Sequence, residues 1–170
     1  MSYDVLEEYI AIARANGIVR PVAAAEIAGA VGLPFHLACT LLSIESYGGK
    51  NVWGGDAGGV FSRLPDEVTR ATHRAYLHEV FVNGRTPNGR GPCQITHPSY
   101  DERAEREGLE LWRPYHNMVL GFTVFYEHFQ RYRDHPRGRV WAAARLYNGG
   151  EDYANKFVLR DNHWKGLLWA

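Results

Sequence analysis

Between residues 33 and 51, an apolar helical run ends in an acidic residue and a pair of glycines, in the sequence LPFHLACTLLSIESYGGKN. Leucines recur in this run at the spacing of one helix face, so that face has to be buried against the rest of the chain. Glu45 closes the buried helix, and Gly48 and Gly49 follow it where a ligand can approach the backbone closely. A carboxyl group in such a place is partly removed from water, which raises its pKa and suits a general acid.

The rest of the chain consists of further helical patterns separated by glycine-rich segments, with no internal repeat and no low-complexity linker. Residues 51–64 and 83–91 are predicted to be loops, and the first is also compatible with a small β-hairpin. The expected fold class is therefore mainly α. Apolar periodicity and stop signals predict helices over residues 5–15, 21–31, 34–45, 66–82, 98–107, 117–132 and 140–147.

Composition limits what these helices can belong to. The chain has 170 residues, of which 45% are hydrophobic and 22% are charged, as expected for one globular domain. Nineteen basic residues balance nineteen acidic ones, so net charge provides no general attraction to nucleic acid or anionic lipid. No apolar run is long enough to span a membrane, and the first residues do not resemble a signal peptide. The eight histidines lack metal-ligand spacing, so we expect no metal and no cofactor.

Three short segments place polar side chains beside glycines, namely ESYGG from Glu45, GPCQIT over residues 91–96 and LYNGG over residues 146–150. Each alone has an ordinary structural explanation, as a helix end, a turn or a left-handed helix stop. Together they bring acid, amide and aromatic side chains to glycine loops, which is typical of a ligand site.

Four segments, in order, resemble the superfamily of goose-type lysozymes and soluble lytic transglycosylases. GLPFHLACTLLSIESYGG resembles the catalytic helix that ends in Glu-Ser, and GPCQIT resembles the Gly-Leu-Met-Gln-Ile segment of the sugar cleft. PYHNMVLG resembles the Pro-x-x-Asn-Ile-x-x-Gly helix start, and AARLYNGG resembles Ala-Ala-Tyr-Asn-x-Gly. NVWGGDAGGVFS and TPNGRGPCQIT are closest to lysozyme-like domains of actinobacteriophage endolysins. The resemblance covers residues 33–150.

The resemblance implies a single lysozyme-like domain whose glycine-rich loops line a sugar cleft. Residues 1–32 would form N-terminal helices, residues 33–150 the catalytic core, and residues 151–170 a tail packed on that core. The implied activity is cleavage of the β-1,4 bond between N-acetylmuramic acid and N-acetylglucosamine in peptidoglycan, with Glu45 as the general acid. Trp53 is expected either to stack on a sugar or to lie in the core. The implied substrate-binding residues are Ser46, Tyr47, Gln94, Tyr100, Tyr147 and Asn148.

The second carboxylate of such a site is less clearly marked. Asp56, in the loop sequence WGGDAGG, stands where the resemblance implies one of the acids of goose-type lysozymes and would activate water. Asp66, Glu67 and Asp101 compete with it, but each is better explained as charge at a helix N-terminus. Lytic transglycosylases work with a single glutamate, so hydrolysis and transglycosylation both stay open.

The chain departs from the family pattern where Pro92 and Cys93 replace Leu-Met before the glutamine. A Cys39–Cys93 bridge is geometrically conceivable, but two free thiols are favoured because cytosolic disulfides are rare. Cys93 with His97 as a nucleophile pair is a further alternative, although no orienting acid is evident.

Two other classes of function are compatible with parts of the sequence. Residues 21–45 have the helix, glycine turn and helix of a DNA-binding helix-turn-helix, but residues 35–46 contain no Lys, Arg, Asn or Gln for base or phosphate contacts. A non-catalytic peptidoglycan-binding or virion module would keep the fold without the chemistry.

The favoured interpretation is a monomeric phage endolysin domain made in the host cytoplasm. It would reach the wall by holin-type release or by delivery with a virion, alone or as a module of a longer lysin.

Overall fold

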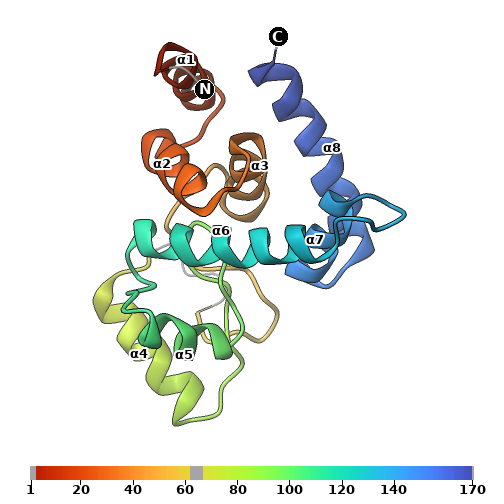
Figure 1. Ribbon diagram of the computed structural model, residues 1–170. Coiled ribbons are helices and arrows are strands. Elements are labelled where there is room, and N and C mark those ends of the chain that lie inside the picture. Colours follow the sequence, from red (N-terminus) through yellow and green to blue (C-terminus); the bar gives the residue numbers. More distant parts are fainter. Residues whose placement is uncertain (1–2, 62–66, 170) are drawn as a thin grey trace.

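The computed structural model describes residues 3–61 and 67–169, which form eight α-helices joined by loops (Figure 1). The mainly α fold class expected from the periodicity is confirmed. In the described ranges the backbone forms no β-strand, and only isolated bridges, Val52–Glu67 and Trp53–Arg90, occur near the expected hairpin. Residues 62–64 of that predicted loop and Asp66 lie outside the described residues. The helices are α1 (Tyr3–Ala15), α2 (Pro21–Val31), α3 (Phe35–Ser46), α4 (Arg70–Phe81), α5 (Ser99–Arg106), α6 (Pro114–Arg131), α7 (Arg139–Asn148) and α8 (Glu151–Leu168).

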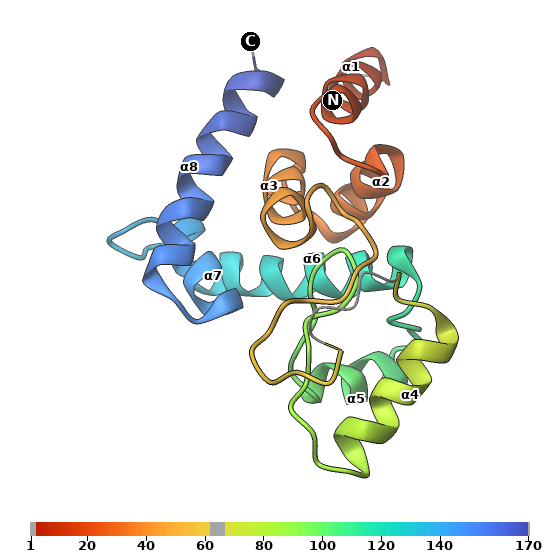
Figure 2. The same ribbon diagram turned by 180° about the vertical axis from the view of Figure 1, so that it is seen from behind.

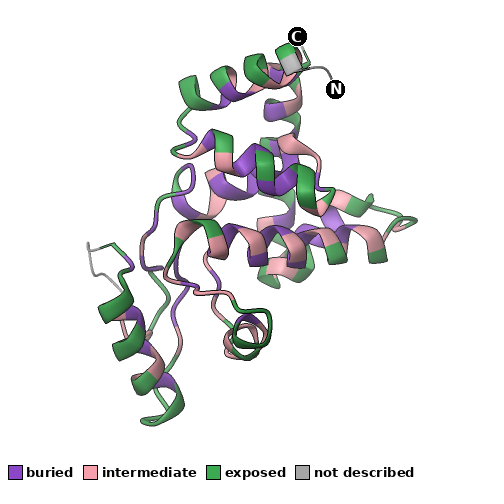
Figure 3. Cartoon of the chain, turned by 60° about the vertical axis from the view of Figure 1, so that its left-hand side comes forward, coloured by how far each residue is buried: buried purple, intermediate pink, exposed green. Residues whose placement is uncertain are grey.

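Helix α3 lies at the centre of the larger core, where α2 and α8 flank it (Figures 1 and 2). Leu37, Leu41 and Leu42 are fully buried, in agreement with the apolar face expected from their spacing. Buried positions are concentrated along α3 and α6, whereas much of α4 is exposed (Figure 3). Because its neighbours cover it, α3 lacks the exposed face that a DNA-recognition helix requires.

Helices α4 and α5 and the loops beside them form the other end of the molecule (Figures 1 and 2). Here Trp53 packs against Phe61 and Tyr76, with ring centroids 4.7 and 5.3 Å apart, and belongs to a second apolar cluster with Val68 and Val80. Trp53 is only 6% exposed, so its ring is a core component and is not available to stack on a sugar. This cluster attaches the loop that follows α3 to helix α4.

Within the segment 151–170, expected to be a tail packed on the core, residues 151–168 form the 18-residue helix α8. Phe157 stacks on Phe125 of α6 at 4.9 Å, and the indole N–H of Trp164 donates to the Ser43 hydroxyl of α3 at 3.1 Å. Buried Asp161 pairs with His36 of α3, with Nδ1 and Oδ1 2.5 Å apart. Helix α8 is thus joined to α3 by polar as well as apolar contacts.

Two helices begin three or more residues away from the predicted start, for reasons visible in their first turns. Helix α4 begins at Arg70 instead of residue 66, because the Thr69 hydroxyl accepts the Thr72 N–H in a capping box. Helix α6 begins at Pro114, three residues earlier than predicted, since proline suits the first helical turn. None of the described helices is both long and apolar enough to cross a membrane.

Candidate active site

Glu45 is the penultimate residue of α3, and the helix stops immediately after Ser46 because Tyr47 adopts a left-handed conformation with φ 53°. The Glu45 side chain is half-buried and lines a pocket of about 310 Å³. The pocket is formed by the end of α3, two glycine-rich loops and the end of α7. Its lining residues are Glu45, Gly54, Gly55, Asp56, Gly89, Gln94, Thr96, Tyr147 and Asn148.

Burial, opposed by a hydrogen bond from Tyr153 and reinforced by the nearby Asp56 carboxylate, raises the pKa of Glu45 to about 7. The hydroxyl of Tyr153 donates a hydrogen bond to Glu45 Oε1, which acts in the opposite direction because it favours the ionised form. The net effect is a carboxyl group that is still substantially protonated near neutral pH. This is the protonation state that a general acid needs.

Tyr153 lies on α8, 108 residues after its partner, and the sequence analysis missed it. Its signal was nevertheless present: Glu151 and Asp152 follow two glycines, as at a helix start, and Ala154 and Phe157 continue an apolar spacing. Recognising that helix would have placed a tyrosine in its first turn.

Gln94 connects the two glycine loops under the pocket. It adopts a positive φ of 48°, and its side-chain Nε2 donates to the carbonyls of Val52 and Gly91 at 3.0 and 2.9 Å. Its Oε1 would lie 2.5 Å from a Cβ at Gly54 and 2.6 Å from one at Gly89. Glycine is therefore required at both positions because a side chain would displace the Gln94 amide. Both amide hydrogens of Gln94 serve the scaffold, which leaves Oε1 as its remaining polar atom.

Asp56 projects from the first glycine loop into the same pocket and is exposed. Its Oδ2 accepts the backbone N–H of Gly89 at 2.6 Å, which fixes the carboxylate relative to the second loop. The structure thus brings Asp56 and Glu45 to one pocket, as the sequence analysis expected of the two acids.

Asn117 of α6 supports the second loop from below. Its Oδ1 accepts the Cys93 N–H at 2.8 Å, and its Nδ2 donates to the Arg90 carbonyl at 3.0 Å. Gly121, one turn later, leaves room for Cys93, whose Sγ would lie 2.6 Å from a Cβ at that position. The Pro-x-x-Asn-x-x-x-Gly spacing noted in the sequence therefore serves to seat the loop on α6.

Tyr147 and Asn148 end helix α7 at the pocket wall. The Tyr147 hydroxyl donates to the Cys93 carbonyl at 2.7 Å, and its ring packs on Phe125 with centroids 5.8 Å apart. Asn148 is exposed, so its amide is accessible to a ligand. Glycine at residue 149 then ends the helix in a left-handed conformation.

Three of the implied substrate-binding residues do not line the pocket. Ser46 is buried, and its hydroxyl donates to the Pro92 carbonyl at 2.6 Å, which ties α3 to the second loop. Tyr47 points to the surface with 81% of its area exposed. Tyr100 is half-buried on α5, where it packs against the main core.

Both cysteines are free thiols in the core, with no bridge between them. Burial raises the pKa of Cys93 well above its usual value, whereas a nucleophilic cysteine needs a lowered one. The ring of His97 instead contacts the Ser99 hydroxyl at 2.8 Å. The Cys93–His97 alternative therefore lacks both an activated thiol and the required contact.

Asp101 lies in the first turn of α5, as expected for acidic charge at a helix N-terminus, and it has a second role in addition. It forms a buried ion pair with Arg90, which is itself fully buried and stacks over the Tyr76 ring at 4.7 Å. The Arg90 Nη1 also donates to the Tyr76 hydroxyl and the Ile95 carbonyl, both at 3.0 Å. Local sequence patterns do not show this pair, because Arg90 lies in a loop and Asp101 lies on helix α5.

The residues that the structure describes contain no group of three or more His, Cys, Asp or Glu side chains arranged to hold a metal ion. We found no match to this chain among protein-family models, curated proteins or solved structures.

Proposed function

We propose that this chain is a peptidoglycan-cleaving glycosidase of the lysozyme type, in which Glu45 is the general acid. The observation that carries the proposal is the Glu45 carboxyl group, half-buried in a pocket with its pKa raised to about 7. The substrate class rests on the resemblance of the four ordered segments to goose-type lysozymes and lytic transglycosylases. That resemblance also underlies the proposal of a lysozyme-like fold.

In the proposed reaction, Glu45 donates its proton to the glycosidic oxygen as the bond between the two amino sugars breaks. The sugar ring that keeps the anomeric carbon of the broken bond acquires oxocarbenium character, which a nearby carboxylate stabilises, and the other sugar leaves with the glycosidic oxygen and the proton. Tyr153 holds Oε1 of Glu45, so the proton is expected on Oε2, facing away from that contact. Asn148 and Gln94 Oε1 are the polar groups available for the sugars and their N-acetyl groups.

Two outcomes of this chemistry follow from what Asp56 does. If Asp56 activates water, the product is a reducing N-acetylmuramic acid and the enzyme is a muramidase. Its exposure within the same pocket supports this role, because water can reach it. If Glu45 acts alone and later accepts a proton from the muramic 6-hydroxyl, the product is 1,6-anhydromuramic acid, as in lytic transglycosylases.

The biological setting that fits this activity is host lysis by a phage. We propose that the protein acts as a monomeric endolysin domain, made in the host cytoplasm and reaching the wall through holin-type release or delivery by a virion. The likeness of the loops to actinobacteriophage endolysins supports this setting.

The deciding experiment is mass spectrometry of products from purified peptidoglycan treated with wild-type protein and with Glu45→Gln. The glutamine keeps the shape but has no transferable proton, so we expect the variant to lose at least about 100-fold in rate. Asp56→Asn should lose a comparable factor only if the wild type gives reducing ends. Substantial cleavage by Glu45→Gln would overturn the assignment, and no cleavage by the wild type would favour a non-catalytic wall-binding module.

A further inference from the structure

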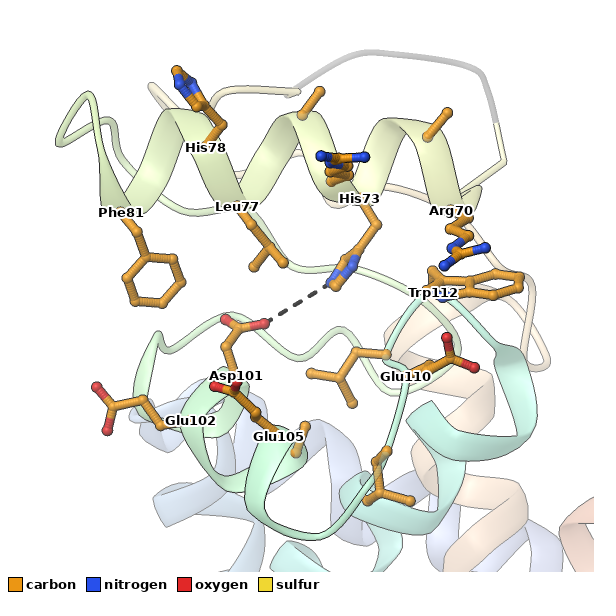
Figure 4. A pocket seen from close by; sticks show the side chains of 16 residues that line it. Arg70, His73, Leu77, His78, Phe81, Asp101, Glu102, Glu105, Glu110 and Trp112 are labelled. Carbon is orange, nitrogen blue, oxygen red and sulfur yellow. Dashed lines mark ion pairs between the residues drawn. The ribbon is translucent and has the colours of Figure 1, made fainter.

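A second and larger hollow lies between α4 and α5 (Figure 4). This α4–α5 groove has a volume of about 1410 Å³ and shares no lining residue with the Glu45 pocket. Pockets for small molecules usually span about 300–1,000 Å³. The groove therefore has room for a short stretch of polymer.

The two walls of the groove carry opposite charges. Arg70 and Arg74 line it from α4, and Glu102 and Glu105 line it from α5. Figure 4 labels Arg70, Glu102 and Glu105. All four side chains are exposed, and none of them forms an ion pair or side-chain hydrogen bond with any residue that the structure describes. A ligand carrying both signs of charge can therefore pair with both walls.

The floor of the groove is mostly apolar but contains two buried polar atoms without partners. His73 Nε2 and Asp101 Oδ2 lack a hydrogen-bond partner among the described residues, and His73 is only 8% exposed. The His73 ring points from α4 across the groove toward Asp101, with Nε2 3.9 Å from Oδ1 (Figure 4). Buried polar atoms in native proteins are nearly always satisfied, so these two indicate a place for a polar group of a ligand.

We infer that the α4–α5 groove binds a short peptide bearing both carboxylate and ammonium groups. The peptide carboxylates pair with Arg70 and Arg74, and its ammonium group pairs with Glu102 and Glu105. A peptide N–H donates to Asp101 at the floor, and small side chains rest on Leu77.

In peptidoglycan such a peptide is the stem attached to the muramic acid, and this part of the inference rests on the proposed function. A peptide fits these observations better than a second glycan strand does. An uncharged sugar chain would leave the four wall charges unmatched, and the exposed Phe81 and half-buried Leu77 favour apolar side chains. The groove would then hold the wall by its peptides while the Glu45 pocket acts on its glycan.

The test measures binding to the 170-residue chain that carries Glu45→Gln, so that no cleavage interferes. The probes are the free tetrapeptide L-alanyl-γ-D-glutamyl-meso-diaminopimelyl-D-alanine and the uncharged disaccharide N,N′-diacetylchitobiose, each followed by NMR titration. We expect the tetrapeptide to shift resonances of α4 and α5, with a Kd that weakens as salt is added. The double change Arg74→Gln and Glu105→Gln should weaken that Kd about tenfold.

The matched control is the double change Glu26→Gln and Arg160→Gln, which removes exposed charges of the same signs from α2 and α8. It should leave the tetrapeptide Kd unchanged. Equal affinity of the groove variant and the control would overturn the inference, as would disaccharide binding in the groove with no response to the tetrapeptide.

These outcomes are separable from those for the proposed function. If cleavage depends on Glu45 but the groove substitutions do not change tetrapeptide binding, the proposed enzymatic function stands and the proposed peptide site is wrong. If the groove substitutions weaken tetrapeptide binding but the wild-type protein cleaves no peptidoglycan, the proposed peptide site stands and the proposed enzymatic function is wrong.

Discussion

At the scale of single residues, the environment of Glu45 depends on one partner that comes from far along the chain. Glycine-marked turns and helix ends indicated Glu45, Gln94, Tyr147 and Asn148, the family resemblance added Asp56, and all five line one pocket. No local pattern could show that the Ser46 hydroxyl donates to the Pro92 carbonyl, or that the hydroxyl of Tyr153 on α8 donates to Glu45. Those contacts depend on packing between distant segments.

We expect Tyr153→Phe to move the alkaline limb of the pH–rate profile to higher pH by about one unit. The hydrogen bond from Tyr153 stabilises the ionised Glu45 and lowers its pKa, so its loss keeps the acid protonated at higher pH. The measurement is kcat/KM for wall fragments between pH 5 and 9. Tyr132→Phe, at the end of α6, is the control and should leave the limb in place. A limb that stays fixed in Tyr153→Phe would show that the hydroxyl does not tune the acid.

Glu45 also makes stability depend on pH. In the folded protein the Glu45 carboxyl group keeps its proton up to about pH 7, whereas in the unfolded chain it releases the proton near its ordinary pKa of 4.5. Between these values the folded state binds more protons, so the free energy of unfolding falls as pH rises from about 4.5 to about 7 and changes little above. Glu45→Gln removes this slope, and we expect it to be more stable than wild type by about 1–3 kcal/mol at pH 8 and equal to it at pH 4. Urea denaturation at both pH values measures the difference, and a variant that is less stable at pH 8 would contradict it.

At the scale of helices, periodicity identified seven segments but not the last. Most of the seven carry an apolar stripe or end at a glycine, whereas residues 151–168 intersperse their buried positions with charged ones, a pattern that indicates only a tail. Burial of Ala154, Phe157, Asp161 and Trp164 on one side of α8 shows that the stripe exists but includes a buried acid. Because Asp161 occupies one of the buried positions, the apolar residues of α8 do not by themselves form a recognisable helical stripe.

Phe157→Ala should therefore lower the free energy of unfolding by about 3–5 kcal/mol, the usual cost of emptying a buried phenylalanine site. Its ring is fully buried and stacks on Phe125. Leu159→Ala on the same helix is the control, since Leu159 is 71% exposed and its loss should cost less than about 0.5 kcal/mol. Chemical denaturation followed by circular dichroism compares the two, and similar losses would mean that α8 is not docked as described.

At the scale of the whole molecule, the two ends are built differently. The extensive helix–helix contacts join α1, α2, α3, α6, α7 and α8, whereas α4 is attached chiefly through the small cluster around Trp53 and Tyr76. The buried Arg90–Asp101 pair adds a polar connection between the second loop and α5. The candidate active site takes side chains from both ends, so it depends on how they are held together.

We expect amides in α4 to exchange with deuterium at least about tenfold faster than amides in α3 and α6, because fewer apolar contacts break when α4 opens locally. Hydrogen exchange followed by mass spectrometry of peptides from each helix measures this. Within α4, the exposed outer positions offer no protection, so any slow amides should cluster near Tyr76 and Val80. Equal protection of α4 and α3 would indicate a single cooperative unit.

The contact between Glu45 and Tyr153 has a consequence for the order in which the protein is made. The ribosome delivers Glu45 first, and the residue that completes its surroundings follows 108 residues later. At about 5–20 residues per second, that interval lasts about 5–20 seconds. During it Glu45 lacks the hydrogen bond from Tyr153, which in the finished protein favours the ionised carboxylate. The contact that sets the acidity of Glu45 can therefore form only after the first turn of α8 has been synthesised.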